Sequence, residues 1–527
     1  MRRLEEWVTR QADRRPEAVA IRWGEERISY GDLEERSNRL ARLLTLQGCR
    51  AGDRVLLLLP KSPGAITAML GVLKAGGVYT PVDPKNPAAR VARVLEALEC
   101  RCVLADASTH DLLLESLQRV GGNRLQPRVG LLESRPAGKS SSAHFDLDDL
   151  AACSPASLSA PRAALDLAHI LFTSGSTGSP KGVMITHGNV IHFVEWATRF
   201  FGMTSEDRVS GHSPLHFDLS TFDVYGAFAV GAALHPIPPE LNLLPHRLAD
   251  LIRDAALTQW FSVPSILVHM AKADAVRPGD FPALRRLLWC GERFPTPGLI
   301  HWMRRLPHVT FTNLYGPTET TIASSYHRVP HCPENDREEI PVGRGCDGEE
   351  LLVLDADLRP IPVGELGELF IRGVGLSPGY WRDPERTAAA FLPDHDGNGG
   401  RLYRTGDLAK LTAHGEVVLL GRADSQVKSR GYRIELGEIE SALASVQEVQ
   451  EGAVVAIDSA GFEGTALCCV YVPRPAVHLS PALLRQRLAT MLPPYMLPTR
   501  WKTVDRLPLN PNGKVDRPRL KELWSEA

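Results

Sequence analysis

LFTSGSTGSPKGV, residues 171–183, is the most informative stretch of this chain, because its composition suits it to wrapping phosphate. Its glycines let the backbone approach an anion closely and turn successive N–H groups toward it, and its serine and threonine hydroxyls add donors. Lys181 follows Gly-Ser-Pro and precedes Gly-Val, so the spacing differs from the G-x-x-x-x-G-K-[ST] loop of P-loop nucleotide hydrolases. The stretch therefore indicates a different nucleotide-using fold, with a flexible Ser/Gly surface loop as the alternative.

Length and charge limit the classes of protein to consider. The 527 residues predict two to four structural units, and 43% hydrophobic with 23% charged residues is typical of a folded globular chain. Sixty basic and 62 acidic side chains give a formal net charge of −2, so no basic field is available to attract nucleic acid or an anionic membrane. We expect neither nucleic acid nor membrane as a partner.

The N-terminus and the cysteines favour a reducing cytoplasm as the location. Residues 1–21 carry charges throughout and lack the apolar run of a secretory signal, and no apolar run approaches the ~18 residues that span a bilayer. Nine cysteines are scattered from Cys49 to Cys469, and the close pairs among them lack a partner pair at zinc-site spacing. Free thiols in the cytoplasm are the expectation.

Short apolar runs alternate with helical patterns in the first part of the chain. Residues 54–60 and 102–107 are typical of buried strands, and residues 65–77 between them have helical spacing closed by glycine. This alternation predicts an α/β fold with a large N-terminal domain of mixed and parallel sheets and covering helices. The Ser/Ala/Pro-rich stretch from Ser134 to Pro161 is predicted to be an exposed connection.

A second boundary follows residue 420. The charged and polar run in residues 421–435 gives way to an amphipathic helix beginning near Leu436, and then to a strand-like run at 466–472 and a helix from about Pro481. We predict a large domain over residues 1–421, a hinge over 422–425 and a small mobile α+β lid over 426–527.

Two aspartates stand in the apolar segment HFDLSTFDVYGAF, residues 216–228. An unpaired carboxylate in such a setting is costly, so Asp218 and Asp223 each need a cation or a donor. For Asp218 the functional interpretation is a salt bridge to a substrate ammonium. The alternative is that Asp218 caps the helix that follows it.

Three further segments carry candidate ligands for a nucleotide. In NLYGPTETT, residues 313–321, Tyr315 offers a ring for a purine, and Thr318 with Glu319 suits Mg²⁺, although a turn before a capped helix is the alternative. In YRTGDL, residues 403–408, the Asp407 carboxylate suits two ribose hydroxyls, although Gly-Asp is also a common turn. Lys514 follows Asn-Gly on a tight turn near the C-terminus, where most lysines are merely solvated.

Taken together, these segments resemble one family, the adenylation domains of nonribosomal peptide synthetases. These domains belong to the adenylate-forming enzymes, with acyl-CoA synthetases and firefly luciferase. The resemblance runs in family order through the following segments: 28–33, 73–83, 171–183, 217–220, 313–319, 367–381, 403–408, 421–440, 492–498 and 512–517. Ser429 and Ser377-Pro378 depart from the usual residues, at positions not expected to do chemistry.

The resemblance implies a two-step ligase that uses ATP and Mg²⁺. The family joins a carboxylic acid to AMP with loss of pyrophosphate, and then passes the acyl group to a thiol. The positions that match the family's nucleotide-binding residues are Thr173, Ser174, Gly175, Ser176, Thr177, Gly178, Lys181, Asn313, Tyr315, Gly316, Asp407, Arg422 and Arg433.

Within that set the resemblance assigns individual roles. The loop from Thr173 to Lys181 is expected to hold the β and γ phosphates, Tyr315 to face the adenine and Asp407 to bind the ribose. Arg422 and Arg433 are candidates for nucleotide contact.

The catalytic set implied by the resemblance is Lys514, Thr318 and Glu319. Thr318 is expected to reach the α-phosphate, and Glu319 to contribute to the Mg²⁺ site. Lys514 is expected to bridge the substrate carboxylate and the α-phosphate as charge builds between them. Because Lys514 belongs to the predicted lid, the lid has to rotate between the two steps, and Asp424 matches the family's hinge position.

The positions that match the family's substrate pocket favour a small apolar amino acid. They are Phe217, Asp218, Leu219, Phe222, Phe261, Leu288, Cys290, Gly291, Leu314, Ile322 and Ala323. Apart from Asp218, these side chains offer no charge, and a polar substrate head would be desolvated there at a cost of roughly 1–3 kcal/mol per group. Proline is the first choice, because the leucine-rich pattern resembles that of stand-alone prolyl-adenylating enzymes, with alanine- or valine-sized groups next.

The expected partner is a separate carrier protein with a phosphopantetheine arm. No carrier segment follows Arg517, so transfer is expected in trans, or else the chain is a domain excised from a longer synthetase; Met1 favours the free-standing form. Two alternatives remain. One is an acyl-CoA ligase for a small carboxylic acid, which the presence of Asp218 weakens, and the other is a catalytically silent nucleotide-binding relative, which Lys514, Glu319 and Asp407 argue against.

Overall fold

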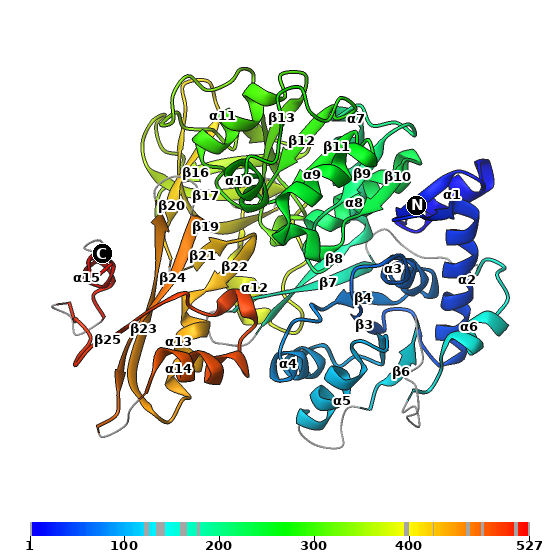
Figure 1. The fold of residues 1–527 in the computed structure, drawn as a ribbon, viewed down its shortest axis with the longest axis horizontal. Coiled ribbons are helices and arrows are strands. Elements are labelled where there is room, and N and C mark those ends of the chain that lie inside the picture. Colours follow the sequence, from blue (N-terminus) through cyan, green and yellow to red (C-terminus); the bar gives the residue numbers. More distant parts are fainter. Residues whose placement is uncertain are drawn as a thin grey trace.

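The structure of the chain is a computed structural model (Figure 1) that describes residues 3–120, 126–132, 143–158, 166–175, 180–394, 400–424, 426–459, 464–475, 479–510 and 515–524. Its α-helices are α1 (Glu6–Arg14), α2 (Tyr30–Leu46), α3 (Pro63–Ala75), α4 (Ala88–Leu98), α5 (His110–Arg119), α6 (Leu147–Ala152), α7 (His187–Phe200), α8 (Leu219–Val230), α9 (Pro245–Asp254), α10 (Pro264–Lys272), α11 (Thr296–Arg305), α12 (Pro384–Ala390), α13 (Leu436–Ala444), α14 (Pro481–Ala489) and α15 (Arg517–Glu522). Short 3₁₀ turns are η1 (Pro239–Leu243), η2 (Thr318–Thr320) and η4 (Pro494–Met496).

A six-stranded sheet holds the predicted strand–helix alternation. Its order is β6-β5-β3-β4-β7-β8, with only β8 antiparallel to its neighbour. The strands are β3 (Arg54–Leu58), β4 (Val78–Pro81), β5 (Cys102–Ala105), β6 (Arg128–Leu131), β7 (Leu167–Thr173) and β8 (Lys181–Thr186). Helix α3 begins where the Ser62 side chain accepts the Ala65 N–H and ends at Gly76, whose φ of 80° suits glycine. The strands predicted at 54–60 and 102–107 and the helix predicted at 65–77 are confirmed.

A nine-stranded sheet forms the second layer. Its order is β15-β14-β13-β12-β11-β9-β10-β1-β2, with a parallel centre and antiparallel strands at both edges. The strands are β1 (Val19–Trp23), β2 (Glu26–Ser29), β9 (Arg208–Gly211), β10 (Ala233–Pro236), β11 (Gln259–Ser262), β12 (Arg286–Trp289), β13 (Thr310–Tyr315), β14 (Ser325–Arg328) and β15 (Arg344–Gly345). The largest cluster of buried apolar side chains draws on both sheets and on helices α2, α3, α7 and α8, so these helices join the two sheets into one core.

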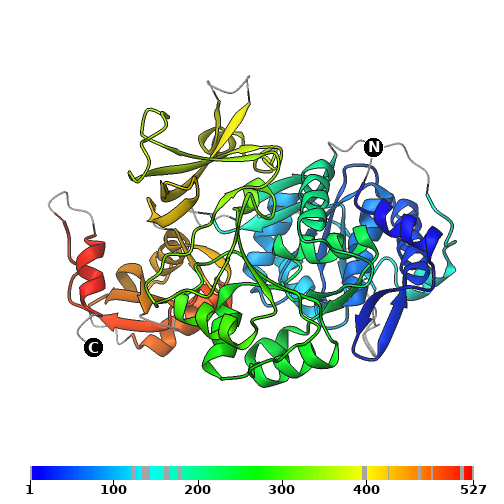
Figure 2. The same cartoon turned by 90° about the horizontal axis from the view of Figure 1, so that it is seen from above.

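An antiparallel sheet of five strands follows. Strands β16 (Glu349–Leu354), β17 (Gly367–Gly373), β19 (Arg401–Leu411) and β18 (Phe391–Pro393) lie in that order, and β20 (Val417–Arg422) pairs with β19. Figure 2 shows these strands, in yellow-green, on one side of the larger layered part. The long strand β19 matters for the site because it carries Asp407.

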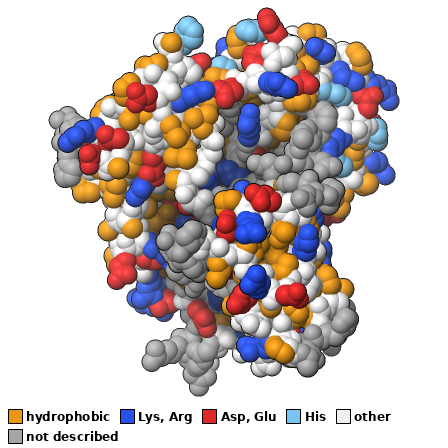
Figure 3. Space-filling view, turned by 90° about the vertical axis from the view of Figure 1, so that its left-hand side faces the viewer, with side chains coloured by type: hydrophobic (Ala, Val, Ile, Leu, Met, Phe, Trp, Pro, Cys, Tyr) orange, Lys and Arg blue, Asp and Glu red, His pale blue; other side chains and the backbone are white. Residues whose placement is uncertain are grey.

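The C-terminal residues form separate sheets. Strands β21 (Gln426–Ser429) and β22 (Tyr432–Glu435) form a hairpin, and β23 (Val449–Ser459), β24 (Gly464–Pro473) and β25 (Arg500–Thr503) form a three-stranded sheet. Strand β24 alternates between two apolar clusters: Cys469 and Tyr471 face α13 and α14, whereas Cys468 and Val470 face the side of α15. Acidic and basic side chains are interspersed on the face of the molecule that this part occupies (Figure 3).

The structure confirms the α/β fold class and corrects one detail. The stretch from Ser134 to Pro161, predicted to be an exposed connection, contains helix α6, and Phe145 within it is only 1% exposed and packs over Gly130. An aromatic ring covering a glycine at a sheet edge has no strong local signature. Strand β20 ends at Arg422 and β21 begins at Gln426, so residues 422–425 join two sheets; the predicted division into 1–421, a hinge at 422–425 and 426–527 stays a prediction.

No helix in the described part of the chain is long and apolar enough to cross a membrane.

Candidate functional site

A cavity opens at the ends of the central parallel strands. Val263 follows β11, Gly291 follows β12 and Gly316 follows β13, which is the edge of an α/β sheet where ligands usually bind. The cavity measures about 920 Å³ with its open mouth. Its described lining is Leu171, Phe172, Thr173, Ser174, His216, Phe217, Asp218, Leu219, Val263, Gly291, Gly316, Pro317, Thr318, Thr405, Asp407, Arg422, Gln426, Lys428, Gly431, Tyr432, Arg433 and Tyr495.

The predicted phosphate loop joins β7 to β8 at the edge of this cavity. The Thr173 Oγ1 atom is buried and has no hydrogen-bond partner among the described residues, and the Ser174 hydroxyl donates to the carbonyl of Arg433 at 2.5 Å. Gly175 is buried beside them, and Lys181 begins β8 with its Nζ 3.7 Å from a carboxylate oxygen of Glu435. Three predicted loop residues, Ser176, Thr177 and Gly178, lie outside the described residues.

Glu319 is fully buried and ionised. Its carboxylate accepts one hydrogen bond from Arg433 Nη1 at 2.7 Å and one from the Tyr380 hydroxyl at 2.7 Å. Burial raises the pKa of the Glu319 carboxyl, but the nearby Arg433 and Lys181 outweigh this effect and lower that pKa to about 2. Glu319 therefore carries a full negative charge over the whole physiological pH range.

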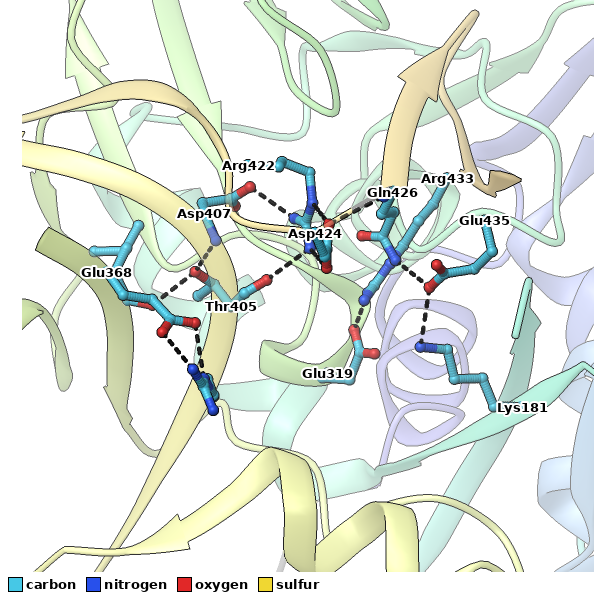
Figure 4. A network of polar contacts seen from close by, with 12 residues as sticks. Lys181, Glu319, Glu368, Thr405, Asp407, Arg422, Asp424, Gln426, Arg433 and Glu435 are labelled. Carbon is cyan, nitrogen blue, oxygen red and sulfur yellow. Dashed lines mark hydrogen bonds and ion pairs between the residues drawn. The ribbon is translucent and has the colours of Figure 1, made fainter. Parts of the chain in front are cut away.

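Asp407 belongs to a polar network that leads to the predicted hinge (Figure 4). Its two carboxylate oxygens accept hydrogen bonds from the Tyr315 hydroxyl and, at 2.7 Å, from Arg422 Nη1. Arg422 also donates to both carboxylate oxygens of Asp424, and Asp424 accepts the Gln426 N–H. The predicted ribose-binding, nucleotide-binding and hinge residues thus form one connected chain of contacts.

Asp218 lies at the start of α8 and faces the cavity. It occupies the N-cap position but makes no side-chain capping hydrogen bond, so the capping alternative does not describe what its carboxylate does. Burial raises the pKa of this carboxyl to about 6, although hydrogen bonding to Thr318 and to the Leu219 backbone works in the opposite direction. Asp218 is half-buried and forms no salt bridge with the described residues, although the charge of Lys428 also lowers its pKa, so its carboxylate is suited to pairing with a cation supplied by a ligand.

Asp223, the other aspartate of that segment, is fully buried one helical turn further on. Burial raises the pKa of its carboxyl well above the usual value, against the opposing charge of Lys61. It does not line the cavity, so it belongs to the supporting structure of α8.

The remaining pocket positions form a packed apolar wall. Phe217, Leu219 and Gly291 line the cavity beside Asp218, whereas the others lie behind this surface in the main core: Phe222, Phe261, Leu288, Cys290, Leu314, Ile322 and Ala323. Thr321 and Ile322 adopt positive φ values of 63° and 69°, which a β-branched residue rarely does. The packing around Thr321 and Ile322 therefore holds these two residues of the wall in an unusual backbone conformation.

Of two other predicted nucleotide-binding residues, Gly316 lies at the cavity and Asn313 does not. Gly316 lines the cavity, and a Cβ there would approach the Ala323 Cα at 2.6 Å, so only glycine allows this approach. Asn313 does not line the cavity; its side-chain amide donates to the Pro341 carbonyl at 2.8 Å. Asn313 thus fixes the strand edge rather than the cavity surface.

The β21–β22 hairpin supplies cavity residues that the sequence interpretation missed. Gln426, Lys428 and Tyr432 line the cavity, and the Lys428 Nζ lies 5.3 Å from the centre of the Tyr315 ring. Tyr432 stacks on Tyr495 with ring centres 3.6 Å apart. The signal was present, because the charged and aromatic run GRADSQVKSRGYRIELGEIE contains these hairpin residues.

His216 and Glu292 were also missed. His216 lines the cavity with its Nε2 atom 3.7 Å from Asp83, and Glu292 accepts the Gly431 N–H at 2.7 Å and the Ser265 N–H at 3.1 Å. His216 precedes the recognised Phe-Asp pair directly, whereas only the three-dimensional arrangement identifies Glu292.

Lys514, the predicted catalytic lysine, lies outside the described residues. Beside it, Val515 forms an isolated bridge with Leu509, and Arg517 donates to the Val454 carbonyl and to Glu440. Among the described residues that line the cavity, the C-terminal part contributes only the hairpin positions and Tyr495.

These residues can hold a magnesium ion if Arg433 releases Glu319. The described parts of the chain contain no group of three His, Cys, Asp or Glu side chains placed to hold a metal. Mg²⁺ commonly binds through one carboxylate together with substrate phosphates, and the ionised Glu319 beside Thr318 fits that mode. Arg433 would have to release the Glu319 oxygen that it holds.

Comparison with known proteins gives a family assignment. A family profile described as "AMP-binding enzyme" matches residues 8–381, and one described as "AMP-binding enzyme C-terminal domain" matches residues 438–514. Tyrocidine synthase 3 and tyrocidine synthase 1 of Brevibacillus parabrevis are 34% identical over 521 residues and 33% identical over 512 residues. These matches cover 98% and 97% of this chain but only 8% and 44% of the two relatives, so the chain spans less than half of their length.

A solved structure agrees with this result. The adenylation domain AlmE of Vibrio cholerae, in complex with glycyl-adenosine-5'-phosphate, has a TM-score of 0.84 and 25% identity, over 99% of this chain and 98% of its own. The resemblance to adenylation domains stated from the sequence is confirmed.

Proposed function

The chain belongs to the AMP-binding enzyme family and is an ATP-dependent, AMP-forming ligase, and from this premise we propose that it activates a small apolar α-amino acid. The amino acid, with proline as the first choice, becomes an aminoacyl adenylate with release of pyrophosphate. The aminoacyl group then passes to the phosphopantetheine thiol of a separate carrier protein.

Asp218 carries the amino-acid part of the proposal. It faces the cavity with a carboxyl that burial has raised to a pKa of about 6, and it lies beside Thr318, which is proposed to reach the α-phosphate. A substrate ammonium would supply a directly paired cation, which Asp218 lacks among the described residues, and would place the substrate carboxylate near the phosphate. A fatty or aryl acid would leave Asp218 without that partner, which disfavours the acyl-CoA ligase alternative.

The apolar wall supports a small substrate side chain. Phe222 and Phe261 are fully buried with ring centres 6.0 Å apart, and Leu288 is buried on the neighbouring strand β12. Close packing leaves little space to expand, because a packed core resists added volume. Proline combines small volume with an apolar ring, and neighbouring small amino acids would be poorer substrates, since such walls discriminate a methylene by only ~1–3 kcal/mol.

The nucleotide is proposed to bind along the polar network. Thr173, Ser174 and Lys181 with the adjoining loop would hold the β and γ phosphates, Tyr315 would face the adenine, and Asp407 would exchange its hydrogen bonds for the ribose hydroxyls. Mg²⁺, held by Glu319 and the phosphates, would neutralise charge on the phosphate oxygens. Thr318 and Lys514 would stabilise the charge that develops on the α-phosphate.

We propose that the orientation of residues 426–527 seen here serves thiol transfer. The hairpin closes the cavity, and Arg433 holds the Glu319 oxygen that Mg²⁺ would need, so metal binding and this orientation compete. Adenylation requires Lys514 at the reacting atoms and therefore a different orientation. Residues 422–425, with Asp424 at their centre, would absorb the rotation.

The test is amino-acid-dependent ATP–pyrophosphate exchange across all proteinogenic amino acids, with alanine in both configurations and small aryl and fatty acids as controls. A single strong signal with proline supports the whole proposal. A signal with another small apolar amino acid keeps the mechanism and replaces the substrate. Exchange only with acids that lack an amine would contradict the role of Asp218.

A further inference from the structure

A buried ion pair joins the two moving parts away from the cavity. Arg90, on α4 of the N-terminal part, donates from Nη1 to a carboxylate oxygen of Glu438, on α13 of the C-terminal part. The two side chains are only 4% and 1% exposed. Neither residue lines the cavity, so neither is needed to bind substrate.

Helix α4 makes a second contact beside this pair. Arg93, three residues after Arg90 and therefore on the same face of the helix, donates from Nη2 to the Met491 carbonyl at 3.0 Å. Met491 precedes Tyr495, whose ring stacks on Tyr432 of the hairpin. The α4 contacts thus attach to the part of the chain that packs directly against the hairpin.

Burial determines how much this ion pair contributes to the stability of the orientation seen here. When two charges are buried together, the cost of removing them from water nearly cancels their attraction, so the pair adds little net stability. When one partner is removed, the other charge stays buried without compensation, which is strongly unfavourable. The Glu438 Oε2 atom has no partner among the described residues, so even the intact pair is incompletely satisfied.

We infer that Arg90 and Glu438 form a reversible latch that balances the orientation seen here against the one needed for adenylation. Rotation of the C-terminal part separates the two residues and returns both charges to water, so the latch opens at little cost. The inference rests on the proposed two-step function. Arg90 and Glu438 are positioning residues, because they act through the orientation of the hairpin and touch no reacting atom.

Two variants at the same site are expected to act in opposite directions. Arg90→Met removes the cation that is hydrogen-bonded to the buried Glu438 carboxylate, leaving it only the attraction of Arg93 among the described neighbours on α4, and disfavours this orientation. Arg90→Met combined with Glu438→Leu replaces the pair by apolar contact, which is stable only when buried, and favours this orientation. Arg119→Met, in the exposed Arg119–Glu115 pair on α5, is the matched control for loss of an ion-paired arginine.

The experiment measures both half-reactions and the orientation itself. Pyrophosphate exchange reports adenylation, transfer from preformed aminoacyl adenylate to pantetheine reports the second step, and hydrogen exchange at the Gly431 amide reports whether its contact with Glu292 is made. The last readout needs no activity, so it tests the latch even in a protein that fails to adenylate amino acids. Failure of the proposed function would appear instead as absent exchange activity in the unaltered protein.

We expect Arg90→Met to lower transfer at least tenfold with pyrophosphate exchange within twofold, and to speed hydrogen exchange at Gly431. The double variant should lower pyrophosphate exchange at least fivefold while transfer is kept, and should slow hydrogen exchange at Gly431. Arg119→Met should change none of the three. Equal losses of both half-reactions in Arg90→Met, or the same behaviour in single and double variants, would overturn the latch.

Discussion

The two walls of the cavity are built from different kinds of interaction. The wall beside Asp218 is backed by apolar side chains such as Phe222 and Leu288, which are packed inside the main core. The wall supplied by the C-terminal part meets the rest through buried polar contacts, such as Arg433–Glu319 at 2.7 Å, together with the ring contact of Tyr432 with Phe217. Packed apolar walls keep their shape, whereas ionic contacts between separate parts are made and broken at modest net cost.

The difference fits the proposal that one site serves two reactions. In that proposal the fixed wall selects the amino acid once, and the same selection holds for both steps. Glu319 is engaged here by Arg433 of the hairpin and Asp407 by Arg422 at the predicted hinge, and both carboxylates would be released for nucleotide. Substitutions in the fixed wall should alter substrate choice, and substitutions in the exchanged wall should alter the ratio of the two steps.

Lys514→Ala should give the largest effect on that ratio. Removal of one charge-stabilising donor typically costs ~10²–10³ in rate, so pyrophosphate exchange should fall at least that far. Transfer from preformed adenylate should stay within a fewfold of the unaltered rate, since Lys514 is proposed to act only in the first step. Rapid-quench measurement of each step separates them, and equal loss in both would refute the assignment.

Gly431→Ala should slow transfer by about tenfold. Gly431 has a φ of 80°, and a Cβ there would meet Val263 Cγ1 at 2.6 Å only while the hairpin lies in the cavity. Gly415→Ala is the matched control, because Gly415 has a φ of 73° and nothing within 4 Å of an added Cβ. Both variants share the backbone penalty of ~1–2 kcal/mol. If the two variants slow transfer alike, the contact with Val263 is irrelevant.

The pH dependence of amino-acid use should follow Asp218. Its carboxyl has a pKa of about 6, and only the ionised form pairs with an ammonium, so kcat/KM should fall about tenfold for each pH unit below 6. Stability should depend on pH in the opposite direction to activity. Because the pKa of this carboxyl is raised in the folded state, its contribution to the free energy of unfolding decreases as the pH rises from about 4 through 6. Asp218→Asn should flatten both dependences. An unchanged acid limb in that variant would assign the titration to another group.

Cys290→Ala should give the smallest change, a shift in preference toward a larger ring. Removing Sγ from this fully buried position leaves space for about one more substrate atom, which is worth roughly 1 kcal/mol in the discrimination between two substrates. The ratio of kcat/KM for pipecolate to that for proline should rise two- to tenfold. Cys346→Ala, a buried cysteine outside the predicted pocket set, should leave that ratio unchanged. Equal shifts in the two variants would mean that Cys290 does not border the substrate.

Helices and strands whose start, apolar face and end all lie within one short segment could be predicted from the sequence. Helix α3 follows from Ser62, a run of apolar residues and Gly76, and these features lie within one short segment. The meeting of Asp218, Thr318 and Asp407 at one cavity was predicted through the family resemblance. The ends of the parallel strands gather Asp218 and Thr318 at one edge, whereas Asp407 comes from β19 of the antiparallel sheet.

Contacts between distant segments were not predictable in this way. That Tyr432 would stack on Tyr495 depends on how the hairpin packs within the C-terminal part, and that Glu292 would accept the Gly431 N–H depends on how this part is oriented. No local pattern encodes that orientation. Helix α6 was missed for a similar reason. Phe145, which lies just before the helix, packs over Gly130 of strand β6, and the apolar positions of the helix itself give no sign of this contact.

The most direct test of the account compares proline with cyclopentanecarboxylic acid, which has the same ring size and lacks the amine. The measurement is pyrophosphate exchange by the unaltered protein and by Asp218→Leu. The unaltered protein should prefer proline by at least 10², because a buried carboxylate left without its cation costs ~3–5 kcal/mol, and Asp218→Leu should lose or reverse that preference. An unaltered preference in Asp218→Leu would contradict the claim that Asp218 selects amino acids.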